Sequence, residues 1–117
     1  MREIDLKGLN IAIMGGNSPC KEIIQLLLGD GLKDLGCKII AVADYLPRVE
    51  GLQYAKKRKL LTTTNYSDIF ELENLDLILK LAQDQNLTTI IEKATPLKTK
   101  IINMSHSRAM DLIAHLK

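Results

Sequence analysis

Apolar residues along the chain gather into short continuous runs, separated by segments in which apolar residues recur every three or four positions. A short uninterrupted apolar run is typical of a parallel strand covered on both faces, and three-to-four spacing is typical of an amphipathic helix. The pattern predicts strands over 9–14, 37–43, 60–64, 76–81 and 100–104. It predicts helices over 19–35, 52–58, 84–94 and from Ser107 onward. Strands and helices therefore alternate from end to end.

This alternation demands right-handed crossovers and a parallel sheet. We therefore predict an α/β fold, a three-layer doubly wound sandwich with a mainly parallel sheet of about five strands. No linker, internal repeat or low-complexity tract interrupts the pattern, so residues 1–117 are expected to form a single domain. The sequence is compatible with both a free-standing protein and a module of a longer one.

Residues at the expected helix ends agree with these boundaries. Ser18 and Pro19 fit an N-cap followed by proline at the first helical position. Gly36 fits the C-cap of the same helix. Ser67 is expected to cap a short helical turn over 68–72.

Composition narrows the class of partner. The net charge of +2 is too small to indicate nucleic acid, and 3% aromatic residues supply few platforms for base stacking. Asp30, Lys33 and Asp34 interrupt the longest apolar stretch, and the N-terminus has no signal-peptide pattern. We therefore expect neither nucleic acid nor membrane as a partner.

The two cysteines belong to no CxxC motif or Cys/His cluster, so no metal site is predicted and a reducing, cytoplasmic location is expected. Cys20 falls in the first turn of the first predicted helix. There the helix dipole can lower the pKa of a thiol and suit it to redox sensing. The alternative is a small buried residue that packs against the sheet.

The clearest candidate site lies between Leu9 and Asp44. The first strand is followed by the turn Gly15-Gly16-Asn17-Ser18, a helix, and a second strand that ends on Asp44. A glycine turn lets the backbone approach a pyrophosphate, and a helix N-terminus offers free N–H donors. A carboxylate after the second strand can hold ribose hydroxyls. This order is the front half of a dinucleotide-binding unit, although any doubly wound fold needs a tight turn here.

The residues around this stretch resemble NAD(P)-binding Rossmann domains. The chain is most similar to the N-terminal domains of the homoserine-dehydrogenase and glucose–fructose-oxidoreductase type, and to short Rossmann modules of bacterial signalling proteins. The likeness covers residues 9–82 and rests on Val42-Ala43-Asp44, Pro47, Gly51-Leu52, Ala55, Leu61-Thr62-Thr63-Thr64, Tyr66 and Leu75-Asp76-Leu77-Ile78. It implies a Rossmann-like fold in which Gly15 and Gly16 hold a pyrophosphate and Asp44 binds the adenosine ribose.

The resemblance implies NAD or NADP as the cofactor. Asp44 favours NAD, because its carboxylate would repel a 2′-phosphate. Arg48 and the basic run 56–59 favour NADP, unless they form a solvated helix face. Asn17 and Ser18 complete the binding turn, and Ala82 follows the fourth strand at the same edge of the sheet.

The chain also departs from the GxGxxG pattern of these families. Asn17 stands at the second glycine and Cys20 at the third. Asn tolerates the left-handed backbone region, so the turn can survive, but a side chain there crowds a pyrophosphate. The substrate domain that carries the catalytic lysine or histidine of those dehydrogenases is absent from the sequence. We therefore expect a non-catalytic module that binds a nucleotide ligand and serves regulation or signal transduction.

Two further functions remain open. A degenerate scaffold would serve protein contacts, for example as a homodimer through an apolar face of the last helix, with Met110, Leu112, Ile113 and Leu116. A dehydrogenase fragment is the third possibility. Independently of these functions, Lys80 is the one charge in an apolar strand, and it could reach a ligand phosphate or snorkel to solvent at the strand end. His106, in Ser105-His106-Ser107, has no carboxylate partner at a defined spacing, which favours a loop or capping role.

Overall fold

The computed structural model describes residues 8–15, 18–28, 36–81, 99–103 and 105–116. Five strands lie within a residue or two of the expected ranges, whereas the expected helix over 84–94 falls outside the described residues. In chain order the elements are β1 (Asn10–Met14), α1 (Ser18–Leu27), β2 (Lys38–Ala43), α2 (Glu50–Lys57), β3 (Leu61–Thr63), the 3₁₀ helix η2 (Tyr66–Glu71), β4 (Leu77–Lys80), β5 (Lys100–Asn103) and α4 (His106–Leu116).

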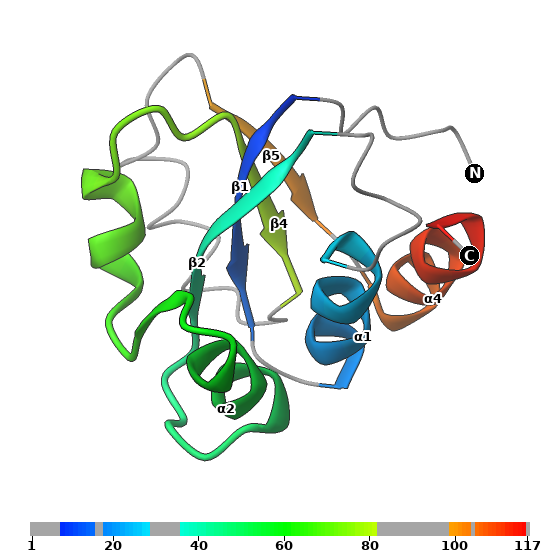
Figure 1. The fold of residues 1–117 in the computed structure, drawn as a ribbon, viewed down its shortest axis with the longest axis horizontal. Coiled ribbons are helices and arrows are strands. Elements are labelled where there is room, and N and C mark those ends of the chain that lie inside the picture. Colours follow the sequence, from blue (N-terminus) through cyan, green and yellow to red (C-terminus); the bar gives the residue numbers. More distant parts are fainter. Residues whose placement is uncertain (1–7, 16–17, 29–35, 82–98, 104, 117) are drawn as a thin grey trace.

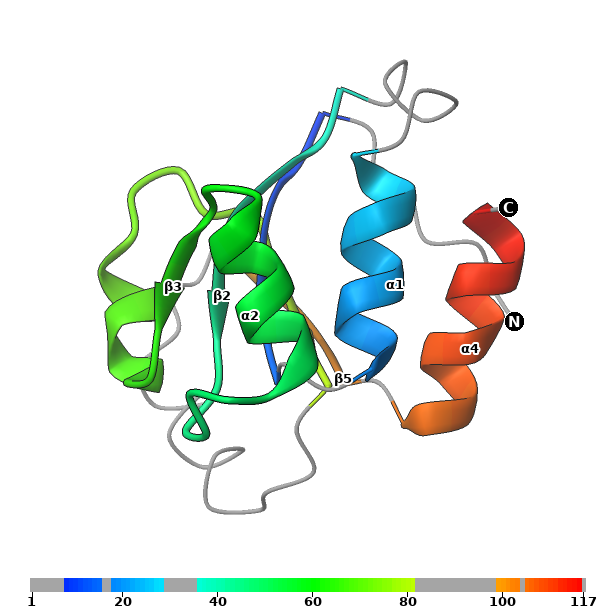
Figure 2. The same cartoon turned by 60° about the horizontal axis from the view of Figure 1, so that its bottom comes forward.

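The strands form one sheet in the order β3-β2-β1-β4-β5, and all four neighbouring pairs are parallel. From β1 the chain adds β2 and β3 on one side and later adds β4 and β5 on the other. Figure 1 labels β2, β1, β4 and β5, and Figure 2 shows β3 beside β2. The strand order therefore reverses between β1 and β4. In open α/β sheets, ligands bind at the carboxyl ends of the strands beside such a reversal.

Helices cover the sheet on both faces, which confirms the expected three-layer α/β fold. Figure 2 shows α1, α2 and α4 on one face and η2 on the other. The first core cluster lies under α1, α2 and α4, and the second lies under η2. Along β1, Ile11 and Ile13 belong to the first cluster, while Ala12 and Met14 belong to the second. The apolar run of β1 is continuous because both of its faces are buried.

Two helix ends differ from the sequence prediction. The helix α1 ends at Leu27, so Gly36 does not cap it. Gly29 and Gly31 follow directly in the sequence, and glycine is a poor helix former, which accounts for the early end. Gly36 instead precedes β2 with φ of +65°, a left-handed conformation that glycine adopts at no steric cost.

The short helix η2 begins earlier than predicted, and its cap is Asn65 rather than Ser67. The Asn65 Oδ1 atom accepts a hydrogen bond from the Ser67 backbone N–H at 3.1 Å. An Asn side chain readily reaches the backbone N–H two residues on, which starts the turn before Ser67. The last helix likewise begins at His106, one residue early, because Ser105 Oγ accepts from the Arg108 N–H at 3.2 Å.

Candidate functional site

The carboxyl ends of β1, β2 and β4 meet at one edge of the sheet. Backbone hydrogen bonds continue past the strands there. The Gly15 N–H donates to the Ala43 carbonyl at 2.7 Å, and the Leu81 N–H donates to the Met14 carbonyl at 2.8 Å. These bonds hold the start of the glycine turn between the ends of β2 and β4.

The glycine turn begins with a residue that must be glycine. Gly15 is buried and has φ of +112°, a conformation that L side chains rarely adopt. The helix α1 then starts at Ser18, so its N-terminus lies at the same edge as the strand ends. Three predicted site residues, Gly16, Asn17 and Ala82, lie outside the described residues.

Asp44 follows β2 directly and shapes the loop that leads to α2. Its Oδ1 atom accepts from the Leu46 N–H at 2.9 Å, and its own N–H donates to the Thr63 carbonyl at 3.1 Å. The Asp44 carboxylate therefore caps the loop that follows β2. The same bond fixes the orientation of the half-buried carboxylate at the edge of the sheet.

The thiol of Cys20, in the first turn of α1, is buried and is affected by the charge of Asp44. This thiol is fully buried, and desolvation together with the negative charge of Asp44 raises its pKa to about 12. The hypothesis of a helix dipole that lowers this pKa is therefore wrong, because burial outweighs the dipole. Cys20 belongs to the first core cluster, as the alternative reading predicted.

Two exposed apolar side chains follow Asp44, and sequence analysis missed them. Tyr45 is 51% exposed and Leu46 is 63% exposed. The Tyr45 ring packs edge-on against Tyr66, with the ring centroids 4.3 Å apart. Large apolar side chains exposed beside a polar edge are a surface on which a flat heterocycle can lie. In the sequence, this surface is indicated by two large apolar residues, Tyr45 and Leu46, that directly follow Asp44.

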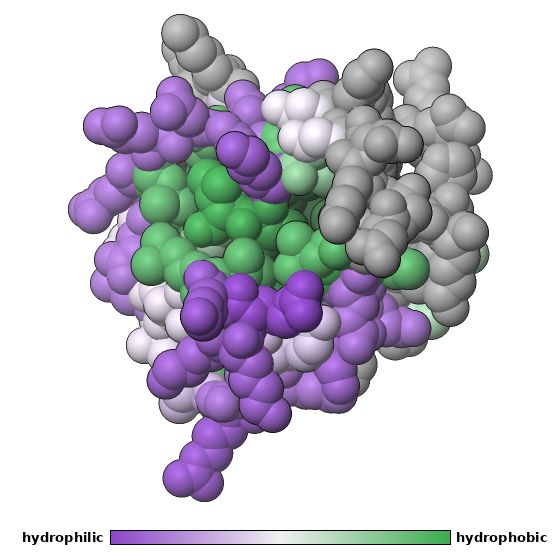
Figure 3. Space-filling model, in the orientation of Figure 1, coloured by the Kyte–Doolittle hydropathy of each residue, from purple (hydrophilic) through white to green (hydrophobic). Residues whose placement is uncertain are grey.

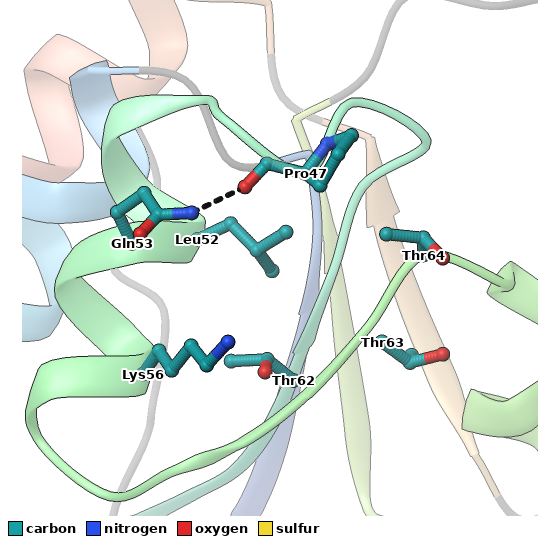
Figure 4. Close-up of a pocket in the computed structure, with 7 residues that line it drawn as sticks. All are labelled: Pro47, Leu52, Gln53, Lys56, Thr62, Thr63 and Thr64. Carbon is teal, nitrogen blue, oxygen red and sulfur yellow. Dashed lines mark hydrogen bonds between the residues drawn. The ribbon is translucent and has the colours of Figure 1, made fainter.

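A cavity of about 360 Å³ lies between α2 and the end of β3, beside the loop of Asp44. Figure 4 shows the Leu52 side chain extending from α2 toward the strands and the Lys56 ammonium directed toward Thr62. Gln53 Nε2 donates to the Pro47 carbonyl at 2.5 Å, which ties α2 to the loop. The full lining is Pro47, Leu52, Gln53, Lys56, Thr62, Thr63 and Thr64. Arg48 lies exposed in the same loop but does not line the cavity.

Lys80 ends β4 at this edge. Its backbone pairs with Met14, the residue before Gly15, and it is only 7% exposed. Among the described residues it is the one buried side chain that is polar or charged. Alternation along β4 places it on the same face as Ile78, opposite to α1.

The other candidates of the last helix contribute less. Ser105 caps α4, as the capping interpretation of Ser105-His106-Ser107 predicted. Met110 is 40% exposed.

In the described ranges no group of three or more His, Cys, Asp or Glu residues is arranged to hold a metal ion. None of the helices in those ranges is long and apolar enough to cross a membrane.

Solved structures with the same arrangement of strands and helices include two proteins of related fold. One is SirC, a precorrin-2 dehydrogenase, with a TM-score of 0.58 and 17% identity over 89% of this chain and 50% of that one. The other is GenD2 from gentamicin A biosynthesis, solved in complex with NAD, with a TM-score of 0.58 and 17% identity over 97% of this chain and 33% of that one. The chain thus spans half or less of the length of these proteins.

At this level of identity the likeness shows the fold, which is a Rossmann-like α/β fold. No family model and no curated protein matches the sequence. The similarity to the homoserine-dehydrogenase and glucose–fructose-oxidoreductase type therefore rests on the sequence resemblance alone.

Proposed function

We propose that this chain is a Rossmann-type module that binds NAD or NADP, or a related phosphate-bearing nucleotide, and performs no reaction on it. The observation that carries the proposal is the convergence of Gly15, the N-terminus of α1 and Asp44 at the reversal of strand order. The complex of GenD2 with NAD supports the choice of ligand, because that protein shares this fold.

In the proposed complex the pyrophosphate lies over Gly15 and the first turn of α1. Backbone N–H groups there have no partner within the helix and coincide with the positive end of its dipole. Asp44 is the acceptor for the ribose hydroxyls, and Tyr45 and Leu46 offer apolar surface to the adenine. Lys80, buried beside the strand that leads into the glycine turn, adds positive potential at this edge.

The choice between NAD and NADP depends on two opposing charges. The Asp44 carboxylate disfavours a 2′-phosphate, whereas the Lys56 ammonium in the neighbouring cavity and the exposed Arg48 favour one. Asp44 is held in place by its hydrogen bond to Leu46, while the two cations sit on long exposed side chains. We therefore propose that NAD binds more tightly than NADP.

We propose a regulatory rather than a catalytic role for the module. The thiol nearest to the site, Cys20, is buried and has a raised pKa, which makes it a poor nucleophile. Ser105 has its hydroxyl engaged in capping α4. Binding that orders this edge of the sheet would then be the signal that the module passes on.

A thermal-shift series with NAD, NADH, NADP, NADPH, ATP and coenzyme A tests the proposal. A ligand at about 100 times its Kd adds about 2.7 kcal/mol to the free energy of unfolding, which raises Tm by several degrees. The rise is expected with NAD and is expected to be much smaller in Asp44→Ala. Asp111→Ala, which removes an exposed carboxylate on α4, is the matched control and should keep the full shift. No shift with any of the six compounds would overturn the proposal.

A further inference from the structure

The outer edge of the sheet at β3 carries exposed apolar surface. The strand β3 is last in the strand order and pairs with β2 only over Ala41–Ala43. Within the described residues, Lys38–Ile40 of β2 therefore have no strand on that side. Unpaired edges of this kind are where sheets of separate chains meet.

Four apolar side chains gather at this edge, and we call them the edge patch. Leu61 is 54% exposed, and three partly buried residues pack against the second core cluster: Ile40, Phe70 and Leu72. Leu61 pairs with Ala41, whose side chain belongs to that cluster, so Leu61 lies on the same face of the sheet as η2. Figure 3 shows apolar surface gathered over β2, with hydrophilic side chains above and below it.

The two borders of the edge patch carry opposite charges. On the α2 side, four consecutive cations end the helix and lead into β3: Lys56, Lys57, Arg58 and Lys59. On the η2 side stand three exposed acids: Asp68, Glu71 and Glu73. Figure 2 shows β3 between these two elements. The surface is thus apolar in the centre, basic on one border and acidic on the other.

We propose that a second copy of this chain covers the edge patch in a two-fold symmetric dimer. A two-fold axis parallel to β3 sets α2 of one copy against η2 of its partner, so that cations face acids at both borders. Leu61 then meets its own copy near the axis. This order of charges suits a copy of the same surface and would not by itself suit a uniformly basic or acidic partner.

The face of α4 was the other candidate for self-association. Met110 is exposed there, and the side chains of Leu112, Ile113 and Leu116 lie outside the described residues. The edge patch combines an unpaired strand, a more exposed leucine and matched charges. These three observations favour the edge patch over α4.

Sedimentation equilibrium of the full chain tests the proposal directly. Wild type is expected to dimerise, and Leu61→Glu is expected to raise the dimer Kd at least about tenfold, because a charge then lies at the centre of the contact. Met110→Glu places the same charge on α4 and should leave the Kd unchanged. Circular dichroism and the Tm of each variant show that it is folded. A wild type that stays monomeric at every concentration, or equal dissociation by both variants, would overturn the proposal.

Charge reversal gives a second, independent test. Lys57→Glu and Glu71→Lys should each weaken the dimer, because each places like charges across a border. The double variant restores opposite charges and should recover a Kd close to that of wild type. At about 1 M salt, where the Debye length is about 3 Å, the differences between these variants should shrink. A double variant weaker than both single variants would contradict the proposed orientation of the two copies.

Discussion

Asp44 has a structural role as well as the proposed binding role, and the two can be separated. Its Oδ1 atom holds the Leu46 N–H at 2.9 Å, and an asparagine at this position keeps that acceptor while it loses the charge. Loss of one such hydrogen bond costs about 1 kcal/mol. The local stability of the loop and the preference for NAD therefore depend on different properties of one side chain.

We expect Asp44→Asn to keep the free energy of unfolding close to that of wild type and to reduce the preference for NAD over NADP. Asp44→Ala should lower the free energy of unfolding by about 1 kcal/mol and should also weaken the binding of NAD. Urea denaturation and isothermal titration with both nucleotides measure the two effects. An Asn variant that still rejects NADP as strongly as wild type would mean that the Asp44 charge does not set the preference.

The raised pKa of the Cys20 thiol predicts how the free energy of unfolding changes at high pH. Because the folded-state pKa is raised from 9.0 to about 12, the unfolded chain loses the thiol proton first, and stability falls as pH rises through this window. The slope is about 1.4 kcal/mol per pH unit for one proton. Urea denaturation of wild type and Cys20→Ala across this range isolates the effect, since the difference between them should shrink or reverse with rising pH. Parallel pH profiles would show that Cys20 is not buried as described.

At the scale of elements, the cap of η2 can be tested because two residues compete for it. Asn65→Ala removes the acceptor for the Ser67 N–H and should lower the free energy of unfolding by about 1 kcal/mol. Ser67→Ala leaves that backbone bond in place and should cost less, since it removes only the Ser67 hydroxyl bond to Asn65. Urea denaturation compares the two variants. A larger loss of stability in Ser67→Ala than in Asn65→Ala would identify Ser67 as the cap.

Much of the element order could be predicted because buried parallel strands are continuous apolar runs. Ile11 to Met14 and Leu77 to Leu79 are buried on both faces of the sheet, so each strand stands out without tertiary information. Helix ends were less predictable. Gly36 suits a C-cap by residue type alone, yet α1 ends at Leu27, before Gly29 and Gly31. Asn65 and Ser67 both suit a cap, and geometry selects Asn65.

At the scale of the whole molecule, the properties that matter arise only when distant segments meet. The turn at Gly15 and the carboxylate of Asp44 could be predicted, because each follows an apolar strand at the same edge. The thiol pKa of Cys20 depends on burial in a core built from several elements, which the helix-dipole argument did not include. The cavity at Lys56 and the edge patch around Leu61 likewise depend on how α2, β3 and η2 assemble.

The most direct test of the central claim is a titration of the isotopically labelled chain with NAD, followed by the chemical shifts of its backbone amides. The account predicts that shifts concentrate at the carboxyl edge of the sheet, at Gly15, the first turn of α1 and the Asp44–Leu46 loop. Amides of α4 and η2 should change little. Shifts confined to those two helices, or no shifts at a millimolar concentration of NAD, would contradict a dinucleotide site at this edge.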